Sequence, residues 1–148
     1  MAEIIFRTLT LEDVATVYQI ETRSFKTAWS LNDFKECMAS PKHFKIAAEI
    51  DKKISAYAVI QLSNNRNFYL LKFVVAPEFR RHGLGKIFLE TLLKLIPKRG
   101  GATVYLHVST KNIAAIHLYE SCGFKVINRL ENFYPEDNEN AFVMERKL

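Results

Sequence analysis

Cysteine is scarce in this sequence, and long hydrophobic runs are absent from it. The 148 residues include two cysteines, Cys37 and Cys122, which are too few for a disulfide scaffold and lack metal-ligand spacing. No apolar run approaches the roughly 18 to 20 residues that cross a bilayer, and residues 1–7 lack the basic-then-apolar order of a signal peptide. We therefore expect a cytoplasmic protein with reduced thiols, no metal site and no membrane partner.

Residues that interrupt a chain are also few. The sequence has five glycines and four prolines, and no repeat, low-complexity tract or flexible linker divides it. Its hydrophobic fraction of 49% and charged fraction of 25% are typical of a globular protein. Its length suits one hydrophobic core. Residues 1–148 are predicted to form a single domain.

Basic residues outnumber acidic ones and give a formal net charge of +5. This excess favours an acidic partner, and either coenzyme A or nucleic acid would satisfy it. The lysines are interspersed with acidic residues and form no long basic run, so solvated surface charge is the simpler interpretation. We expect no direct binding of nucleic acid.

Residues 73–86 form the most informative segment, in which an apolar strand leads through a glycine turn into an amphipathic helix. Gly83 and Gly85 let the backbone bend sharply and approach a ligand closely. The first amides of a helix have no partner within it and carry the positive end of its dipole. Basic side chains flank the glycines: Arg80, Arg81 and Lys86. The segment is predicted to bind a phosphate or diphosphate.

Two common nucleotide-binding motifs do not fit this turn. A dinucleotide fingerprint needs a third glycine, where this chain has Phe88, and a Walker motif needs a hydroxyl, where it has Ile87. The remaining pattern, Arg80-x-x-Gly83-x-Gly85, resembles the acyl-CoA pyrophosphate loop of the GNAT acetyltransferase superfamily. The alternative is an ordinary turn with solvated arginines.

Hydrophobic periodicity predicts the element order β-α-α-β-β-β-α-β-α-β-β. The predicted strands are 3–8, 44–50, 54–62, 68–75, 102–108, 124–131 and 140–147. The predicted helices are 11–22, 31–39, 84–96 and 112–121, and a loop is predicted over 132–139. Since the connection between strands 68–75 and 102–108 is a helical crossover, these strands should be parallel if they are neighbours. The other pairs should be antiparallel, which gives a mixed α/β (α+β) sheet with helices on its faces.

Helix-capping signals and apolar spacing add detail to these helices. Thr10 and Ser30 are expected to cap the first two, since each precedes an apolar-periodic run. The spacing of apolar residues predicts that Leu11, Leu31 and Ile87 face inward.

Longer segments extend the resemblance to a GNAT N-acetyltransferase over nearly the whole chain. Residues 112–124 (NIAAIHLYESCGF) are similar to the N-A-A-I-x-L-Y-E-x-x-G-F signature of its N-terminal acetyltransferase branch. Residues 21–34, 132–135 and 140–144 also agree with that branch. Within the branch, the likeness is greatest to the RimI type, which acetylates the N-terminal alanine of a small-subunit ribosomal protein.

The resemblance implies a mixed, mostly antiparallel sheet of about six or seven strands with a splayed parallel pair and about four helices. The pantetheine arm of acetyl-CoA would lie between the splayed strands and pair with backbone groups near Phe73 and Val75, one amide polarising the thioester carbonyl. For Asn112, a helix N-cap role is an equally good interpretation. The residues implied to bind acetyl-CoA are Phe73, Val74, Val75, Arg80, Arg81, His82, Gly83, Leu84, Gly85, Lys86, Asn112 and Tyr119.

Acetyl transfer to an amine needs a deprotonated nucleophile. A peptide α-amine has a pKa near 7.7–8.0 and a lysine side chain one near 10.4, so a modest base suffices for the α-amine. His107 lies on the polar side of strand 102–108 and is the candidate base. The RimI pattern has Glu there, whereas Leu106-His107-Val108 matches some eukaryotic N-terminal acetyltransferases. The alternative is a hydrogen-bonded structural histidine.

Tyr119 is implied to protonate the departing thiolate of coenzyme A, the alternative being a core tyrosine. Since no histidine near either cysteine would activate it, direct attack in a ternary complex is preferred to an acetyl-cysteine. The resemblance also implies that Phe25, Trp29, Tyr134 and Glu21 line a peptide groove, and for Trp29 a core position is an equally good interpretation. Asn140 replaces an acidic residue of the RimI pattern and leaves the accepted first residue open.

We therefore expect an acetyl-CoA-dependent transferase acting on the N-terminal α-amine of a protein, with a ribosomal protein that begins with alanine as the implied acceptor. Two alternatives remain. The acceptor could be a lysine side chain or a small amine, or the chain could bind coenzyme A without catalysis.

Overall fold

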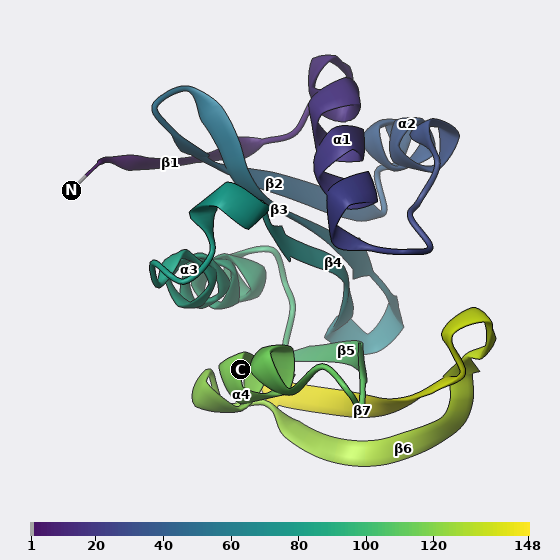
Figure 1. Ribbon diagram of the computed structural model, residues 1–148. Coiled ribbons are helices and arrows are strands. Elements are labelled where there is room, and N and C mark those ends of the chain that lie inside the picture. Colours follow the sequence, from purple (N-terminus) through teal and green to yellow (C-terminus); the bar gives the residue numbers. More distant parts are fainter. Residues whose placement is uncertain (1) are drawn as a thin grey trace.

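Seven strands form one sheet in the computed structural model, which describes residues 2–148 (Figure 1). Their order across the sheet is β1-β2-β3-β4-β5-β7-β6. Their bounds are Ile4–Thr8, His43–Ile50, Lys53–Leu62, Asn67–Val75, Thr103–Ser109, Lys125–Tyr134 and Glu139–Lys147 for β1 to β7. Strands β4 and β5 are parallel, and the other neighbours are antiparallel. The predicted mixed, mostly antiparallel sheet is confirmed.

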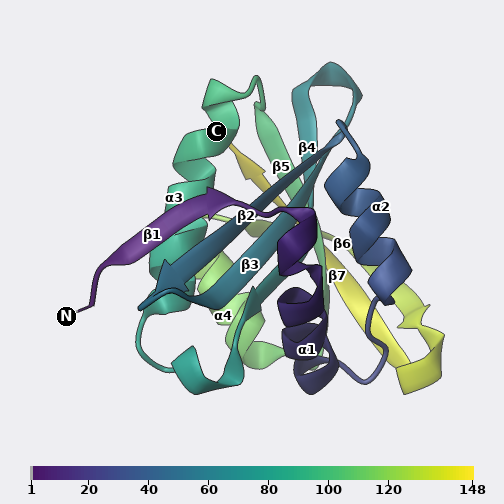
Figure 2. The same cartoon turned by 90° about the horizontal axis from the view of Figure 1, so that it is seen from above.

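Four α-helices cover the two faces of the sheet. They are α1 (Val14–Ser24), α2 (Leu31–Ala39), α3 (Leu84–Lys98) and α4 (Ile113–Ser121). Figures 1 and 2 show α1 and α2 on one face and α3 and α4 on the other. Four short 3₁₀ helices also occur: η1 (Leu11–Asp13), η2 (Asn64–Arg66), η3 (Pro77–Phe79) and η4 (Pro135–Asp137). No helix within residues 2–148 is long and apolar enough to cross a membrane.

Three side chains predicted to face inward are exposed instead: Leu11, Leu31 and Ile87. Leu11 is 64% exposed because the first turn is 3₁₀, so the inward stripe begins only with α1 at Val14. Leu31 occupies the first position of α2, before the helix reaches the core. The buried stripe of α3 advances by four-residue steps, which leave Ile87 outside it.

The predicted loop 132–139 is shorter than expected, since β6 continues to Tyr134. Asn132 has a φ of 52°, and the register of β6 against β7 shifts at this point. The amide of Asn132 donates to Oδ1 of Asn140, at 2.7 Å. This side-chain contact lets β6 continue through the irregularity, where the sequence predicted that the strand would end and a loop begin.

Strands β4 and β5 pair only at their beginnings, as the predicted splay requires. The paired residues are Asn67–Tyr69 and Thr103–Tyr105. Beside this point, Lys72 is opposite Val59 on β3 and Leu70 is opposite Ile60, so Leu71 is an extra residue. Such a bulge bends its strand, and it directs the rest of β4 away from β5 (Figure 1).

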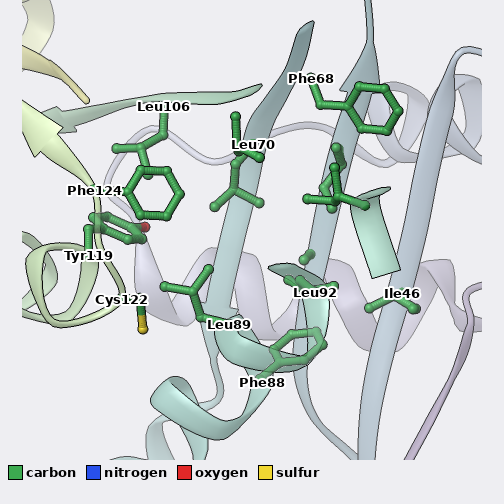
Figure 3. Close-up of a cluster of buried hydrophobic side chains, with 14 of the residues drawn as sticks. Ile46, Phe68, Leu70, Phe88, Leu89, Leu92, Leu106, Tyr119, Cys122 and Phe124 are labelled. Carbon is green, nitrogen blue, oxygen red and sulfur yellow. The ribbon is translucent and has the colours of Figure 1, made fainter. Parts of the chain in front are cut away.

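Two apolar clusters hold the helices to the sheet, and the larger lies beneath α3 and α4 (Figure 3). Phe88 of α3 is fully buried there and stacks on Phe6 and Phe73, with ring centroids 5.9 and 5.4 Å apart. Burying a phenylalanine side chain contributes about 1.5–3 kcal/mol. The helix that begins at the glycine turn is thereby fixed against β4.

Candidate active site

The glycine turn places an open helix N-terminus beside β4. Gly83 has a φ of 77°, which residues with a Cβ adopt at a cost, and α3 begins at Leu84. The first bond of the helix is from Ile87 N–H to the Gly83 carbonyl oxygen, so the amides of residues 84–86 have no acceptor in the helix. No heavy atom lies within 4 Å of where a Cβ on Gly83 would stand. The free amides of residues 84–86, with open space beside Gly83, therefore fit a diphosphate.

Arg80 makes hydrogen bonds across this turn. Its Nε donates to the carbonyl oxygen of Val75 at 2.9 Å, and its Nη2 donates to Oγ of Ser24 at 3.0 Å. The three basic side chains that the sequence grouped together, Arg80, Arg81 and Lys86, are all exposed. Among them, Arg80 closes the turn onto β4 and α1.

Along β4, the backbone amide and carbonyl groups of alternate residues face the splay, the gap where β4 and β5 are no longer paired. The amide of Ala76 donates to the Ser55 carbonyl oxygen at 2.8 Å, and groups of alternate residues in an antiparallel ladder point to the same side. Val74 is therefore turned toward β3, and its side chain is buried. Phe73 and Val75 turn their amide and carbonyl groups toward the unpaired side, which is where the family resemblance implies the pantetheine arm.

Tyr119 lies on the α4 side of the splay and is 8% exposed. Its ring meets those of Phe73 and Phe124 edge-on, with centroids 6.2 and 5.7 Å away, and Figure 3 shows it in the core beneath β5. Burial, with a smaller contribution from the phenol of Tyr134, raises the pKa of Tyr119 above its ordinary value. The hydroxyl therefore stays protonated at neutral pH.

Asn112 caps the helix that carries Tyr119. Its Oδ1 accepts a hydrogen bond from the amide of Ala115 at 3.2 Å. The N-cap interpretation is confirmed, and a further contact with the coenzyme stays a prediction.

His107 lies on the opposite face of β5 from Tyr119. Its neighbours Leu106 and Val108 are buried in the cluster that contains Tyr119, so the alternation of the strand turns His107 the other way. The imidazole stacks on Phe133, with centroids 4.6 Å apart and an interplanar angle of 4°. Partial burial lowers the pKa of His107 below its ordinary value near 6.5.

The predicted groove residues come from two segments that both views place side by side (Figures 1 and 2). Phe25 and Trp29 lie on the connection between α1 and α2, and Tyr134 lies at the end of β6. Trp29 also lines a surface pocket of about 530 Å³ beside α2. Glu21 is 0% exposed and lies beneath this connection, so it does not form an open wall as the sequence suggested.

Another pocket, of about 610 Å³, lies between α1 and the turn from β2 to β3 and contains none of the predicted site residues.

Among residues 2–148, no group of three or more His, Cys, Asp or Glu side chains is arranged to hold a metal. Burial raises the pKa of the Cys37 thiol, which makes it a poor nucleophile.

Sequence reasoning missed two side chains at the site, Phe133 and Lys72. Phe133 was noted only as part of a family signature, and its stacking on His107 follows from the pairing of β6, β7 and β5. Lys72 is the one charged residue in the apolar run 68–75. A single lysine in an apolar strand indicates a buried partner of opposite charge, since a buried lysine needs one.

Comparisons with known proteins agree with this geometry. Residues 11–124 match the acetyltransferase (GNAT) family. The chain is 33% identical over 138 residues to a ribosomal protein bS18 alanine N-acetyltransferase of Salmonella typhimurium, covering 92% of each.

Solved structures give the same result. The ribosomal protein S18 alanine N-acetyltransferase of Escherichia coli superposes with a TM-score of 0.90 at 31% identity, covering 98% of this chain and 94% of that one. Arabidopsis thaliana NAA60 in complex with acetyl-CoA gives 0.86 at 19% identity, covering 99% and 100%, which shows a common fold. The chain therefore belongs to the GNAT family of acetyltransferases, enzymes that use acetyl-CoA.

Proposed function

We propose that this protein transfers the acetyl group of acetyl-CoA to the N-terminal α-amine of a protein by direct attack. The α-amine nitrogen bonds to the thioester carbonyl carbon, the carbon–sulfur bond breaks, and coenzyme A leaves as its thiolate. His107 accepts the proton that the amine loses, directly or through a water, and Tyr119 supplies one to the sulfur. One proton is thus taken from the amine and one is given to the thiolate.

The observation that carries this proposal is the position of His107 and Tyr119 on opposite faces of the sheet at the splay of β4 and β5. A donor bound between the strands would have the acid on one side and the base on the other. Acceptor and coenzyme would enter from opposite faces and could be bound at the same time, as a ternary complex requires. The lowered pKa of His107 keeps its imidazole neutral at pH 7, the form that takes a proton.

Binding of the acetyl donor is assigned to groups whose geometry suits it. Unpartnered amides at the beginning of α3 would hold the diphosphate. The outward-turned backbone of Phe73 and Val75 would pair with the pantetheine arm, and one amide would stabilise the charge that develops on the carbonyl oxygen. Arg80 would act indirectly, by holding the turn closed.

The proposed acceptor is ribosomal protein bS18 or a protein with a similar alanine terminus. Relatives that share about a third of the sequence over nine tenths of its length are bS18 alanine N-acetyltransferases. Phe25, Trp29 and Tyr134 would line the groove that receives this terminus. A ribosomal acceptor would place the encounter in the cytoplasm.

Steady-state assays with matched peptides test the proposal. One peptide begins with a free alanine and contains no lysine, and a second has the same sequence with an acetylated terminus and one internal lysine. We expect acetylation of the first only, measured by coenzyme A release and by mass spectrometry of the terminus. Turnover of the blocked lysine peptide alone would identify a lysine acetyltransferase, and binding of acetyl-CoA without turnover of any amine would identify a non-catalytic protein.

A further inference from the structure

A buried ion pair lies beneath the predicted acceptor groove. Glu21 of α1 is 0% exposed and accepts a hydrogen bond from Nζ of Lys72 on β4 at 2.6 Å. The Lys72 side chain is 12% exposed. The hydroxyl of Tyr57 on β3 also donates to the Glu21 carboxylate. Two formal charges are thus removed from water within one cluster.

The same two side chains hold the connection between α1 and α2. Nζ of Lys72 lies 4.5 Å from the ring centroid of Phe25 and 4.8 Å from that of Trp29. The backbone amide of Trp29 donates to Oε2 of Glu21 at 3.0 Å. Two of the three aromatic residues assigned to the acceptor groove, Phe25 and Trp29, therefore contact one ammonium group. The backbone of Trp29 is also bonded to Glu21, the partner of that ammonium.

Stability alone does not account for such a pair. Taking two charges out of water has a desolvation cost that their attraction offsets only with good geometry, and apolar replacements are often equally stable or more so. A cation held against two aromatic rings, in contrast, fixes the position of both. Trp29 is further fixed by Phe34, whose ring centroid is 5.3 Å away.

We propose that Lys72 is a positioning residue that fixes Phe25 and Trp29 as the wall of the acceptor groove. The identity of the acceptor rests on the proposed function, whereas the contacts of Lys72 with the two aromatic rings do not. Lys72 immediately precedes Phe73, whose backbone faces the splay. Lys72 thus aligns the acceptor wall through its side chain, and the next residue of β4, Phe73, aligns the acetyl donor through its backbone. Reacting atoms that are misplaced by about 1 Å can lose about 100-fold in rate.

The decisive variant is Glu21→Gln/Lys72→Met. It removes both charges together, so no buried charge is left unpaired, and the Gln amide oxygen can still accept from the Trp29 amide. The matched control is Lys45→Met, which removes a partly buried lysine whose Nζ instead donates to the carbonyl oxygens of Met38 and Ser40. The measurements are melting temperature, acetyl-CoA Kd, KM for the alanine peptide, and acrylamide quenching of Trp29, the only tryptophan of the chain.

We expect the double variant to melt within a few degrees of the wild type and to keep its acetyl-CoA Kd within twofold. Its peptide KM should rise about tenfold, and the quenching constant of Trp29 should at least double. Lys45→Met should change neither peptide KM nor quenching. Unchanged quenching in the double variant would overturn the proposal, and so would increased quenching with an unchanged peptide KM.

The two proposals fail in different ways. If the wild type acetylates no peptide terminus, the proposed function is wrong, and the quenching of Trp29 alone decides whether Lys72 fixes the connection. If the wild type is active and the double variant matches it in quenching and KM, the proposed function stands and the role of Lys72 is rejected.

Discussion

The imidazole of His107 lies parallel to the ring of Phe133, with their planes 4° apart and their centroids separated by 4.6 Å. His107 lies on β5 and Phe133 on β6, and β7 is between these strands in the sheet. The aromatic face covers one side of the imidazole and leaves its edge, which carries both nitrogens, available to a substrate. The candidate base is therefore oriented by a residue on a different strand.

Replacing His107 by glutamine should lower kcat for the alanine peptide about 100-fold, because general-base catalysis contributes roughly 10²–10⁴. The acetyl-CoA Kd should change less than threefold, since none of the residues assigned to the donor lies on β5, the strand that carries His107. His117→Gln on the exposed surface of α4 is the control and should behave as the wild type. Stopped-flow or steady-state kinetics with calorimetric titration of the donor gives both quantities. A kcat equal to that of the wild type would reject His107 as the base.

The pH profile should reflect the lowered pKa of His107. A base acts when it is neutral, and partial burial shifts its protonation to lower pH. The peptide α-amine itself bends the acidic limb of log kcat/KM near 7.7–8.0, and His107 should add a second bend below about 6.5, the ordinary histidine value. Phe133→Leu removes the covering ring, so the second bend should move upward toward 6.5. A second bend that stays in place would show that Phe133 does not control the protonation of His107.

Tyr119→Phe should reduce kcat about tenfold while leaving the fold intact, since it removes one hydroxyl and keeps the ring packed against Phe73 and Phe124. The phenol is protonated through the working pH range and can donate a hydrogen bond to a thiolate, while burial, which raises the pKa of Tyr119, makes it a weaker acid. Tyr18→Phe, a partly buried tyrosine on α1, is the control. Burst-phase and steady-state rates would show the loss. Equal rates in both variants would assign Tyr119 to the core alone.

Local sequence patterns predicted most of this fold because they depend on neighbouring residues. Alternation along 102–108 placed His107 opposite Leu106, and Asn112 and Ser30 were correctly identified as helix caps. Contacts between distant residues were not predicted. Lys72 meets Glu21 across 51 positions of the chain, and only the order of the strands brings such residues together. Leu11 was misplaced for a local reason, since the same spacing fits an α-turn and a 3₁₀ turn.

Gly83 and Gly100 offer a comparison of the two ends of α3. Both have positive φ, 77° and 92°, and neither has an atom within 4 Å of the position a Cβ would take. Alanine at either site should cost about 1 kcal/mol through backbone strain alone, measured as a similar fall in denaturant midpoint. Gly83→Ala should also raise the acetyl-CoA Kd at least fivefold, because strain there shifts the amides that begin α3. Gly100→Ala should leave that Kd unchanged, since it lies beyond the far end of the helix. Equal donor affinity in the two variants would mean that the beginning of α3 does not hold the diphosphate.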